Sequence, residues 1–267
     1  MPIKRPNVLV FFTDQQRWDT TGLHGNPLDL TLNLDRMARG GPHVPLAFTP
    51  PPVCGPARAW LLSGQYATQT GCYRNGIPLP RNIPTLAGSF RDAGYRTAYI
   101  GKWHLAPESS LGPVAPEYRG GYDYWLASNV LELTSDAYQT TMFNDEGQPV
   151  ELPGYRVDAL ADAAIRFVAG WEEEKPWFLF LSFLEPHHQN SRDDYPAPTG
   201  YEERYADKWM PPDLASLRSQ DGSGATGGSA GRHLAGYCGM VKRLDEALGR
   251  VEDALRSSGQ LENTILL

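Results

Sequence analysis

The 267-residue sequence has few cysteines, no apolar run of membrane-spanning length and no excess of positive charge. Three widely spaced cysteines argue against a disulfide scaffold. The first apolar run, at 8–12, is too short to cross a bilayer, and no small-residue cleavage site follows it. We therefore expect a cytoplasmic protein with no membrane partner, or a periplasmic or secreted one if the N-terminus is misassigned. The net charge of −7 also argues against a nucleic acid as the main partner.

A nucleotide-binding loop is also missing. Residues 221–228 are rich in glycine and serine but lack the Gly-Lys-Ser/Thr that a phosphate-binding loop requires, so we predict a flexible surface loop there. Residues 108–151 and 190–231 show no regular apolar pattern. We expect both to be long irregular segments that shape a substrate pocket.

Strand and helix patterns alternate along the rest of the chain. Near-continuous apolar runs predict strands at 8–12, 95–100 and 177–183, with another starting at 264. Helical spacing predicts helices at 31–39 (capped by Thr31), 85–93, 157–171 and 234–255. This alternation is typical of an α/β protein with a largely parallel sheet flanked by helices on both faces. We predict one domain over residues 1–267.

Polar side chains follow three of these strands. Asp14 comes after the first strand, Lys102 and His104 follow the second, and His187 follows the strand at 177–183. The carboxyl ends of parallel strands share one edge of a sheet, so we expect these groups to gather there. Each could instead be an ordinary loop residue. Neighbours in an extended chain point in opposite directions, so His187 is expected to enter the site without His188.

The stretch Cys54-Gly55-Pro56-Ala57-Arg58 opens a predicted helix after a proline run. Pro56 is tolerated in a first turn, and a helix start with a nearby guanidinium favours an anion. Alone, the stretch allows a thiolate nucleophile, an anion site or core packing of Cys54. A phosphotyrosine-phosphatase loop has a longer spacing between its cysteine and arginine. We expect Cys72 and Cys238 to be buried core residues.

The Cys-x-Pro-x-Arg spacing, with Leu62 and Gly64 following, resembles the signature of type I sulfatases. Five further stretches are similar to stretches of that family in the same order. They are Pro6 to Asp14, Thr31 to Arg36, Gly101 to Leu105, Ser182 to His187, and Asp245 to Thr264. The resemblance covers nearly the whole chain. It implies an alkaline-phosphatase-like fold and hydrolysis of a sulfate monoester.

The resemblance also implies a metal site. Cys54 would be oxidised to formylglycine by a maturation enzyme, and would contact a divalent cation, usually Ca²⁺ or else Mg²⁺. Asp14 would be an oxygen ligand of that cation, as such a hard ion requires. Many sulfatases have a second aspartate where this chain has Gln15, whose amide oxygen can still coordinate or orient a ligand.

Further roles follow from the same resemblance. Arg58 would hold the formylglycine hydroxyl, and Lys102 would bind a sulfate oxygen. His104 would assist release of sulfate, and His187 would act as general acid on the leaving oxygen. Asn75 would lie near the substrate, which we expect to be a small-molecule or carbohydrate sulfate ester.

The last predicted strand stops at Leu267, before the residues that complete the metal site in the family. We therefore expect the N-terminal catalytic part of a sulfatase, truncated on its C-terminal side, with weak Ca²⁺ binding and poor turnover. Two alternatives stay open. One is a phosphonate or phosphodiester hydrolase of the same superfamily, which the Lys102/His104 pair disfavours. The other is a non-catalytic remnant.

Overall fold

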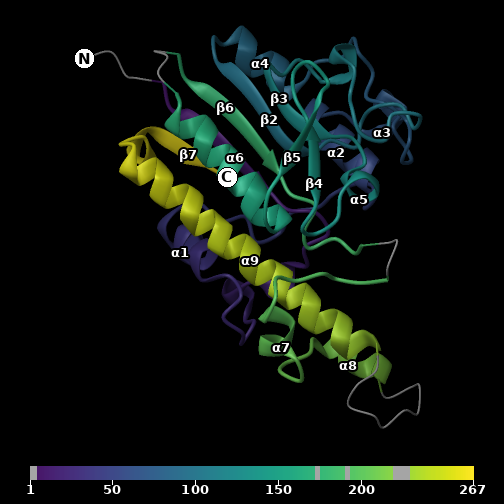
Figure 1. Cartoon of the computed structure of the whole chain (residues 1–267), viewed down its shortest axis with the longest axis vertical. Coiled ribbons are helices and arrows are strands. Elements are labelled where there is room, and N and C mark those ends of the chain that lie inside the picture. Colours follow the sequence, from purple (N-terminus) through teal and green to yellow (C-terminus); the bar gives the residue numbers. More distant parts are fainter. Residues whose placement is uncertain (1–4, 172–174, 190–192, 219–228) are drawn as a thin grey trace. The chain divides into compact units, whose positions relative to one another are not determined.

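The computed structural model describes residues 5–171, 175–189, 193–218 and 229–267 (Figure 1). The chain forms two compact units. Unit 1 comprises residues 1–12, 45–184 and 251–267, and unit 2 comprises residues 13–44 and 185–250. The loop predicted at 221–228 lies outside the described residues. Among the helices described, none combines the length and the apolar character needed to cross a membrane.

Unit 1 is built on a seven-stranded sheet with the order β5-β4-β3-β2-β6-β1-β7 (Figure 1). The strands, in chain order, are β1 (Asn7–Phe12), β2 (Arg96–Lys102), β3 (Tyr124–Ser128), β4 (Thr140–Phe143), β5 (Pro149–Leu152), β6 (Trp177–Ser182) and β7 (Thr264–Leu266). The five strands from β3 to β7 in this order pair in parallel, whereas β4 is antiparallel to both of its neighbours. The prediction of a largely parallel sheet is confirmed.

Helices cover both faces of this sheet. Phe90 of α4 (Leu86–Asp92) stacks on Phe178 of β6 at 4.1 Å between ring centroids. Phe167 of α6 (Arg156–Ala169) contacts Trp177, the preceding residue of β6, at 6.0 Å. Successive strand residues point to opposite faces, so α4 and α6 lie on opposite sides, as predicted.

The first long irregular segment was predicted wrongly. Residues 108–151 contain β3, β4, β5, the short helix α5 (Leu131–Thr134) and a 3₁₀ turn at Pro116–Tyr118. Each piece has five residues or fewer, which is too short for apolar periodicity to appear. These strands depend on pairing with their neighbours in the sheet, and β4 and β5 form a hairpin with each other. Unit 1 also contains α2 (Cys54–Ser63), α3 (Ala67–Thr70) and a 3₁₀ turn at Leu261–Asn263.

Unit 2 is mainly helical. It contains 3₁₀ turns at Trp18–Thr20 and Gly22–His24, then α1 (Leu32–Gly40), α7 (Tyr201–Tyr205), α8 (Pro212–Arg218) and the part of α9 (Ser229–Ser257) up to Arg250. The short helices α7 and α8 therefore replace part of the second segment that was predicted to be irregular.

The start of α1 in unit 2 corrects another prediction. Thr31 makes no side-chain cap there. The Asp245 carboxylate of α9 accepts the backbone N–H groups of Asn33 at 3.1 Å and Leu34 at 2.9 Å instead. The Thr31 hydroxyl donates to Asp35 at 3.2 Å. A carboxylate distant in sequence thus satisfies the free amides of the first turn.

Candidate functional site

The residues predicted for the site fall in both units. Unit 1 holds Cys54, Arg58, Asn75, Lys102 and His104, and unit 2 holds Asp14, Gln15 and His187. The roles predicted for them stay predictions.

Cys54 is the first residue of α2, as the sequence predicted. The next backbone amide, that of Gly55, donates to the Asn75 side-chain oxygen at 2.8 Å. A Cβ at Gly55 would lie 3.0 Å from the same oxygen, which explains why glycine follows Cys54. Asn75, predicted to lie near the substrate, is thus placed next to the predicted nucleophile. In the structure, the Asn75 side chain bonds to the backbone at the start of α2.

Arg58 lies one turn further along α2 and is buried, with 3% of its surface exposed. Its Nη1 donates to the Lys102 carbonyl at 2.8 Å and to the Ser182 hydroxyl at 2.8 Å. Its guanidinium also lies over the Phe12 ring, 5.2 Å from the centroid. Arg58 therefore joins the nucleophile helix to the carboxyl ends of β2 and β6, a task that its predicted role did not include.

Tyr99 also contacts the Lys102 carbonyl that accepts from Arg58. Burial raises the pKa of Tyr99, and the nearby Arg58 cation opposes that shift only in part. Its hydroxyl therefore stays protonated and donates to the Lys102 carbonyl at 2.6 Å. The Ser182 hydroxyl donates to the same oxygen at 2.9 Å. Three donors on one carbonyl fix the backbone at Lys102.

Lys102 is fully buried at the last position of β2. Its Nζ lies 3.8 Å from the Cys54 sulfur. The structure thus brings the two together as the strand-end argument predicted. Its Nζ also forms an ion pair with the Glu132 carboxylate at 3.2 Å.

Gly101, the residue before Lys102, allows β2 to lie close to β6 at Ser182. Its φ is +113°, and a Cβ added there would lie 1.8 Å from the Ser182 carbonyl oxygen. A side chain at this position is therefore excluded both by backbone conformation and by space.

His104 lies at a turn with left-handed backbone, at φ +62°. The backbone N–H of His104 donates to the Asn129 carbonyl at 2.7 Å. The backbone N–H of Ala106 donates to the side-chain oxygen of Asn129 at 3.1 Å. The His104 ring Nδ1 lies 3.8 Å from the Glu132 carboxylate. Non-glycine residues in this conformation persist where the surroundings hold them, and here Asn129 does so.

Glu132 is the site residue that sequence reasoning missed. It belongs to the four-residue helix α5 and has 7% of its surface exposed. The one available signal was a carboxylate between two leucines, Leu131 and Leu133, in the run 124–135, which holds no other charged residue. Ionised side chains are rarely buried without a partner. The spacing of residues along the sequence could not identify Lys102 as the partner of Glu132.

Unit 2 brings Asp14 and His187 together. A carboxylate oxygen of Asp14 and a ring nitrogen of His187 lie within 4.8 Å of each other. The His187 Nδ1 lies 2.6 Å from the His188 carbonyl, which can only accept, so Nδ1 carries the proton. In the neutral ring, Nε2 is then free to accept a proton or bind a metal. The buried Asp14 carboxylate supplies the kind of oxygen ligand that Ca²⁺ or Mg²⁺ takes.

Gln15 and His188 have other partners in unit 2. Gln15 has a left-handed backbone at φ +61°, and its side-chain oxygen accepts the His188 N–H at 3.4 Å. The His188 Nε2 lies 3.1 Å from the Asp193 carboxylate. The two adjacent histidines thus make different contacts.

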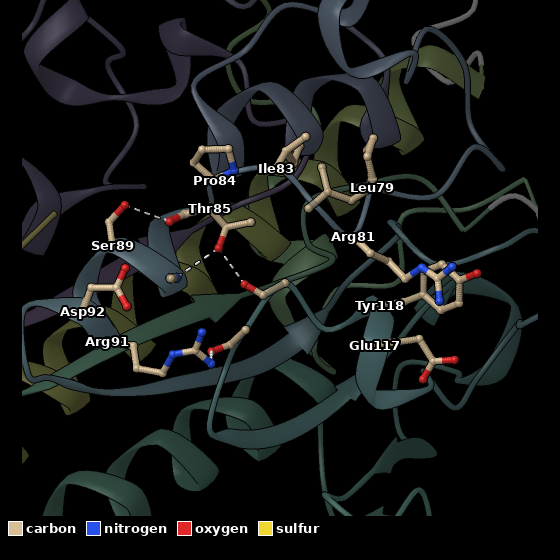
Figure 2. A pocket seen from close by; sticks show the side chains of 14 residues that line it. Leu79, Arg81, Ile83, Pro84, Thr85, Ser89, Arg91, Asp92, Glu117 and Tyr118 are labelled. Carbon is tan, nitrogen blue, oxygen red and sulfur yellow. Dashed lines mark hydrogen bonds between the residues drawn. The ribbon is translucent and has the colours of Figure 1, made fainter.

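A separate cavity of about 360 Å³ in unit 1 is lined by residues from 79–92, which include α4, and from 117–121 (Figure 2). Arg81 lies over the Tyr118 ring at 5.5 Å on one side. On the other, the Thr85 hydroxyl donates to the Gly120 carbonyl at 2.6 Å. The lining includes two arginines and two acids and none of the predicted site residues.

Comparison with known proteins agrees with the family that the sequence motifs indicate. The sequence model of the sulfatase family matches residues 6–267. The chain is 32% identical to the uncharacterized sulfatase YidJ of Escherichia coli, over 98% of this chain and 56% of that protein. It is 30% identical to an ulvan-active sulfatase of Formosa agariphila, over 98% of this chain and 49% of that protein. The chain thus spans about half the length of these relatives.

Solved structures show the same fold. A Bacteroides fragilis protein assigned as the sulfatase yidJ superposes with a TM-score of 0.81 at 26% identity, over 100% of this chain and 62% of that one. A phosphonate monoester hydrolase of Agrobacterium radiobacter gives 0.63 at 24% identity, over 98% and 61%. The fold is alkaline-phosphatase-like, and the chain belongs to the sulfatase family.

Proposed function

We propose that the protein hydrolyses a sulfate monoester, using a formylglycine made from Cys54 and a divalent cation. The observation that carries this proposal is the 3.8 Å approach of the Lys102 ammonium to the Cys54 sulfur at the start of α2, in a member of the sulfatase family. A buried cation beside the positive end of a helix dipole favours a tetrahedral anion there.

Each residue of unit 1 has a proposed task. Lys102 binds a sulfate oxygen, because its ammonium is the cation next to Cys54. Arg58 keeps α2 and β2 in register through its bond to the Lys102 carbonyl, and its charge adds to the positive potential around an anion. His104 assists release of sulfate by holding or moving a proton. Asn75 steadies the helix start that presents Cys54.

In this proposal, Asp14, Gln15 and His187 of unit 2 take part in the metal and acid functions. Asp14, Gln15 and the residue formed from Cys54 would hold Ca²⁺ or Mg²⁺, which would offset negative charge when bound. Since Nδ1 of His187 already carries a proton, its Nε2 is protonated only in the charged ring. That charged form is what a general acid on the leaving oxygen requires.

We propose a sulfated carbohydrate as the substrate class. The support is that one relative is described as active on ulvan and another is an N-acetylglucosamine-6-O-sulfatase of Bacteroides thetaiotaomicron. The second is 29% identical over 73% of this chain. A formylglycine-generating enzyme is the proposed maturation partner.

A second candidate is hydrolysis of phosphonate monoesters or phosphodiesters. It is favoured by the fold shared with a phosphonate monoester hydrolase and by 27% identity to a multifunctional alkaline phosphatase superfamily protein of Trinickia caryophylli. Lys102 and His104 disfavour it, as the resemblance implies.

Turnover of an aryl sulfate against an aryl phosphonate, by the protein matured with a formylglycine-generating enzyme, separates the two candidates. We expect faster sulfate hydrolysis, abolished in Cys54→Ala and strongly reduced in Lys102→Met. A preference for the phosphonate would overturn the proposed function in favour of the second candidate.

A further inference from the structure

The Glu132 carboxylate is buried next to the positive charge of Lys102, beside Cys54. It lies 3.2 Å from the Lys102 ammonium and 3.8 Å from the His104 ring. Lys102 is fully buried and Glu132 nearly so. Two charges in such surroundings interact more strongly than they would in water, so Glu132 alters the potential that a bound anion experiences.

The short helix α5, which carries Glu132, is also held in place. Leu131, the preceding residue of α5, is fully buried. The Thr134 hydroxyl at the end of α5 lies 2.8 Å from the Ser128 hydroxyl at the end of β3. Ser128 in turn pairs with Lys102 in the sheet. The helix that carries Glu132 is therefore fixed to the strand next to the one that carries Lys102.

The charge of the ligand decides what this carboxylate does. A sulfate monoester carries a single negative charge, whereas a phosphate monoester carries close to two above neutral pH. Repulsion by Glu132 acts on each ligand charge, so it weakens binding of the doubly charged ester more. Glu132 also neutralises part of the Lys102 charge. This too weakens binding of the doubly charged ester more than binding of the singly charged one.

We propose that Glu132 is a specificity-determining and positioning residue. It holds the Lys102 ammonium beside Cys54 and makes the site favour a singly charged ester over a doubly charged one. This inference rests on the proposed function, since it assumes that the ester group binds next to Cys54 and Lys102.

The test measures binding without turnover. Protein expressed without a maturation enzyme keeps the Cys54 thiol, and bound ligand slows alkylation of that thiol. Protection by 4-nitrophenyl sulfate and by 4-nitrophenyl phosphate is titrated at pH 8 and constant calcium. Glu132→Gln removes the charge at nearly constant size, and Glu132→Asp keeps it. Glu117→Gln removes an exposed charge that lines the cavity of unit 1 and is the matched control.

We expect Glu132→Gln to improve the affinity for the phosphate relative to the sulfate by about tenfold or more. Glu132→Asp should keep the wild-type ratio within about threefold, and Glu117→Gln should leave it unchanged. An equal change for both esters in Glu132→Gln would overturn the inference alone. Failure of wild-type protein to bind the sulfate ester next to Cys54 would count against the proposed function as well.

A wild-type comparison keeps the inference testable where Glu132→Gln does not fold, as thermal unfolding would reveal. Methyl 4-nitrophenyl phosphate carries one negative charge, and 4-nitrophenyl phosphate carries two at pH 8. We expect wild-type protein to bind the singly charged diester more tightly. Tighter binding of the doubly charged ester would contradict the role given to Glu132.

Discussion

The Arg58 guanidinium donates to the Lys102 carbonyl over 2.8 Å, and this bond ties the helix that begins at Cys54 to the strand that ends at Lys102. The Arg58 side chain therefore sets the position of the predicted nucleophile, Cys54, relative to the buried ammonium of Lys102. A change at Arg58 is expected to affect stability as well as chemistry.

Arg58→Met tests this structural role. It removes a buried cation and leaves the Ser182 hydroxyl and the Lys102 carbonyl each short of one donor. We expect a loss of about 2–4 kcal/mol in the free energy of unfolding, measured by urea denaturation. Arg39→Met, at an exposed position, should change it by less than about 0.5 kcal/mol. Equal small effects of both changes would contradict the role of Arg58 as a junction.

Gly101→Ala tests the close approach of β2 and β6. The added Cβ would lie 1.8 Å from the Ser182 carbonyl oxygen on a backbone with φ of +113°, so the two strands would have to separate. We expect a loss above about 3 kcal/mol in unfolding free energy, or no folded protein. Gly147→Ala, where φ is +75° and the space is open, should cost about 1 kcal/mol by the same measurement. A mild effect at Gly101 would show that the strands adjust easily.

Asp29 predicts a pH dependence of stability in unit 2. Burial raises the pKa of its carboxyl, but a hydrogen bond from Tyr205 and the cations of Lys242 and Arg204 outweigh that effect and leave the pKa below its ordinary value. A carboxyl with a lowered pKa stabilises the folded state above its unfolded pKa, and this contribution is lost as the pH falls through the folded pKa.

Asp29→Asn should therefore lower the free energy of unfolding near pH 7 and cost progressively less below pH 4. Nearly half of the Asp29 side chain is exposed, so solvent screening should keep the difference at neutral pH under about 1 kcal/mol. Asp92→Asn, at an exposed position in unit 1, is the control. A difference between wild type and Asp29→Asn that grows on acidification would reverse the sign and refute this account.

The three cysteines should differ in reactivity before maturation. Burial raises the pKa of the Cys238 thiol to about 12, helped by the nearby Asp19 charge, and burial also raises the pKa of Cys72. Both are buried, whereas Cys54 is partly exposed. We expect iodoacetamide at pH 8 to label Cys54 at least about tenfold faster than either, followed by peptide mass spectrometry. Comparable rates at all three would show that Cys72 and Cys238 are accessible in the folded protein.

The strong periodic parts of the fold could be predicted from the sequence. The apolar run at 8–12 became β1 and the run at 177–183 became β6, because buried parallel strands have continuous apolar sequences. The short strands β3, β4 and β5 could not, since pieces of four or five residues form only against a sheet that already exists. The α1 cap by Asp245 likewise depends on a packing contact between distant residues.

The candidate site divides in the same way. The approach of Lys102 to Cys54 followed from the rule that functional groups collect at the carboxyl ends of parallel strands. The bonds of Arg58 to Lys102 and Ser182 depend on the register between β2 and β6, which the sequence did not specify. Glu132 was missed because it lies on a four-residue helix in a segment without pattern.

The most direct test of the central claim is the mass of the peptide that carries Cys54, after coexpression of this chain with a formylglycine-generating enzyme. The account predicts an aldehyde in place of the Cys54 thiol, while Cys72 and Cys238 keep their thiols in the same digest. A Cys54 that remains an unmodified thiol under conditions that convert a known sulfatase would contradict it.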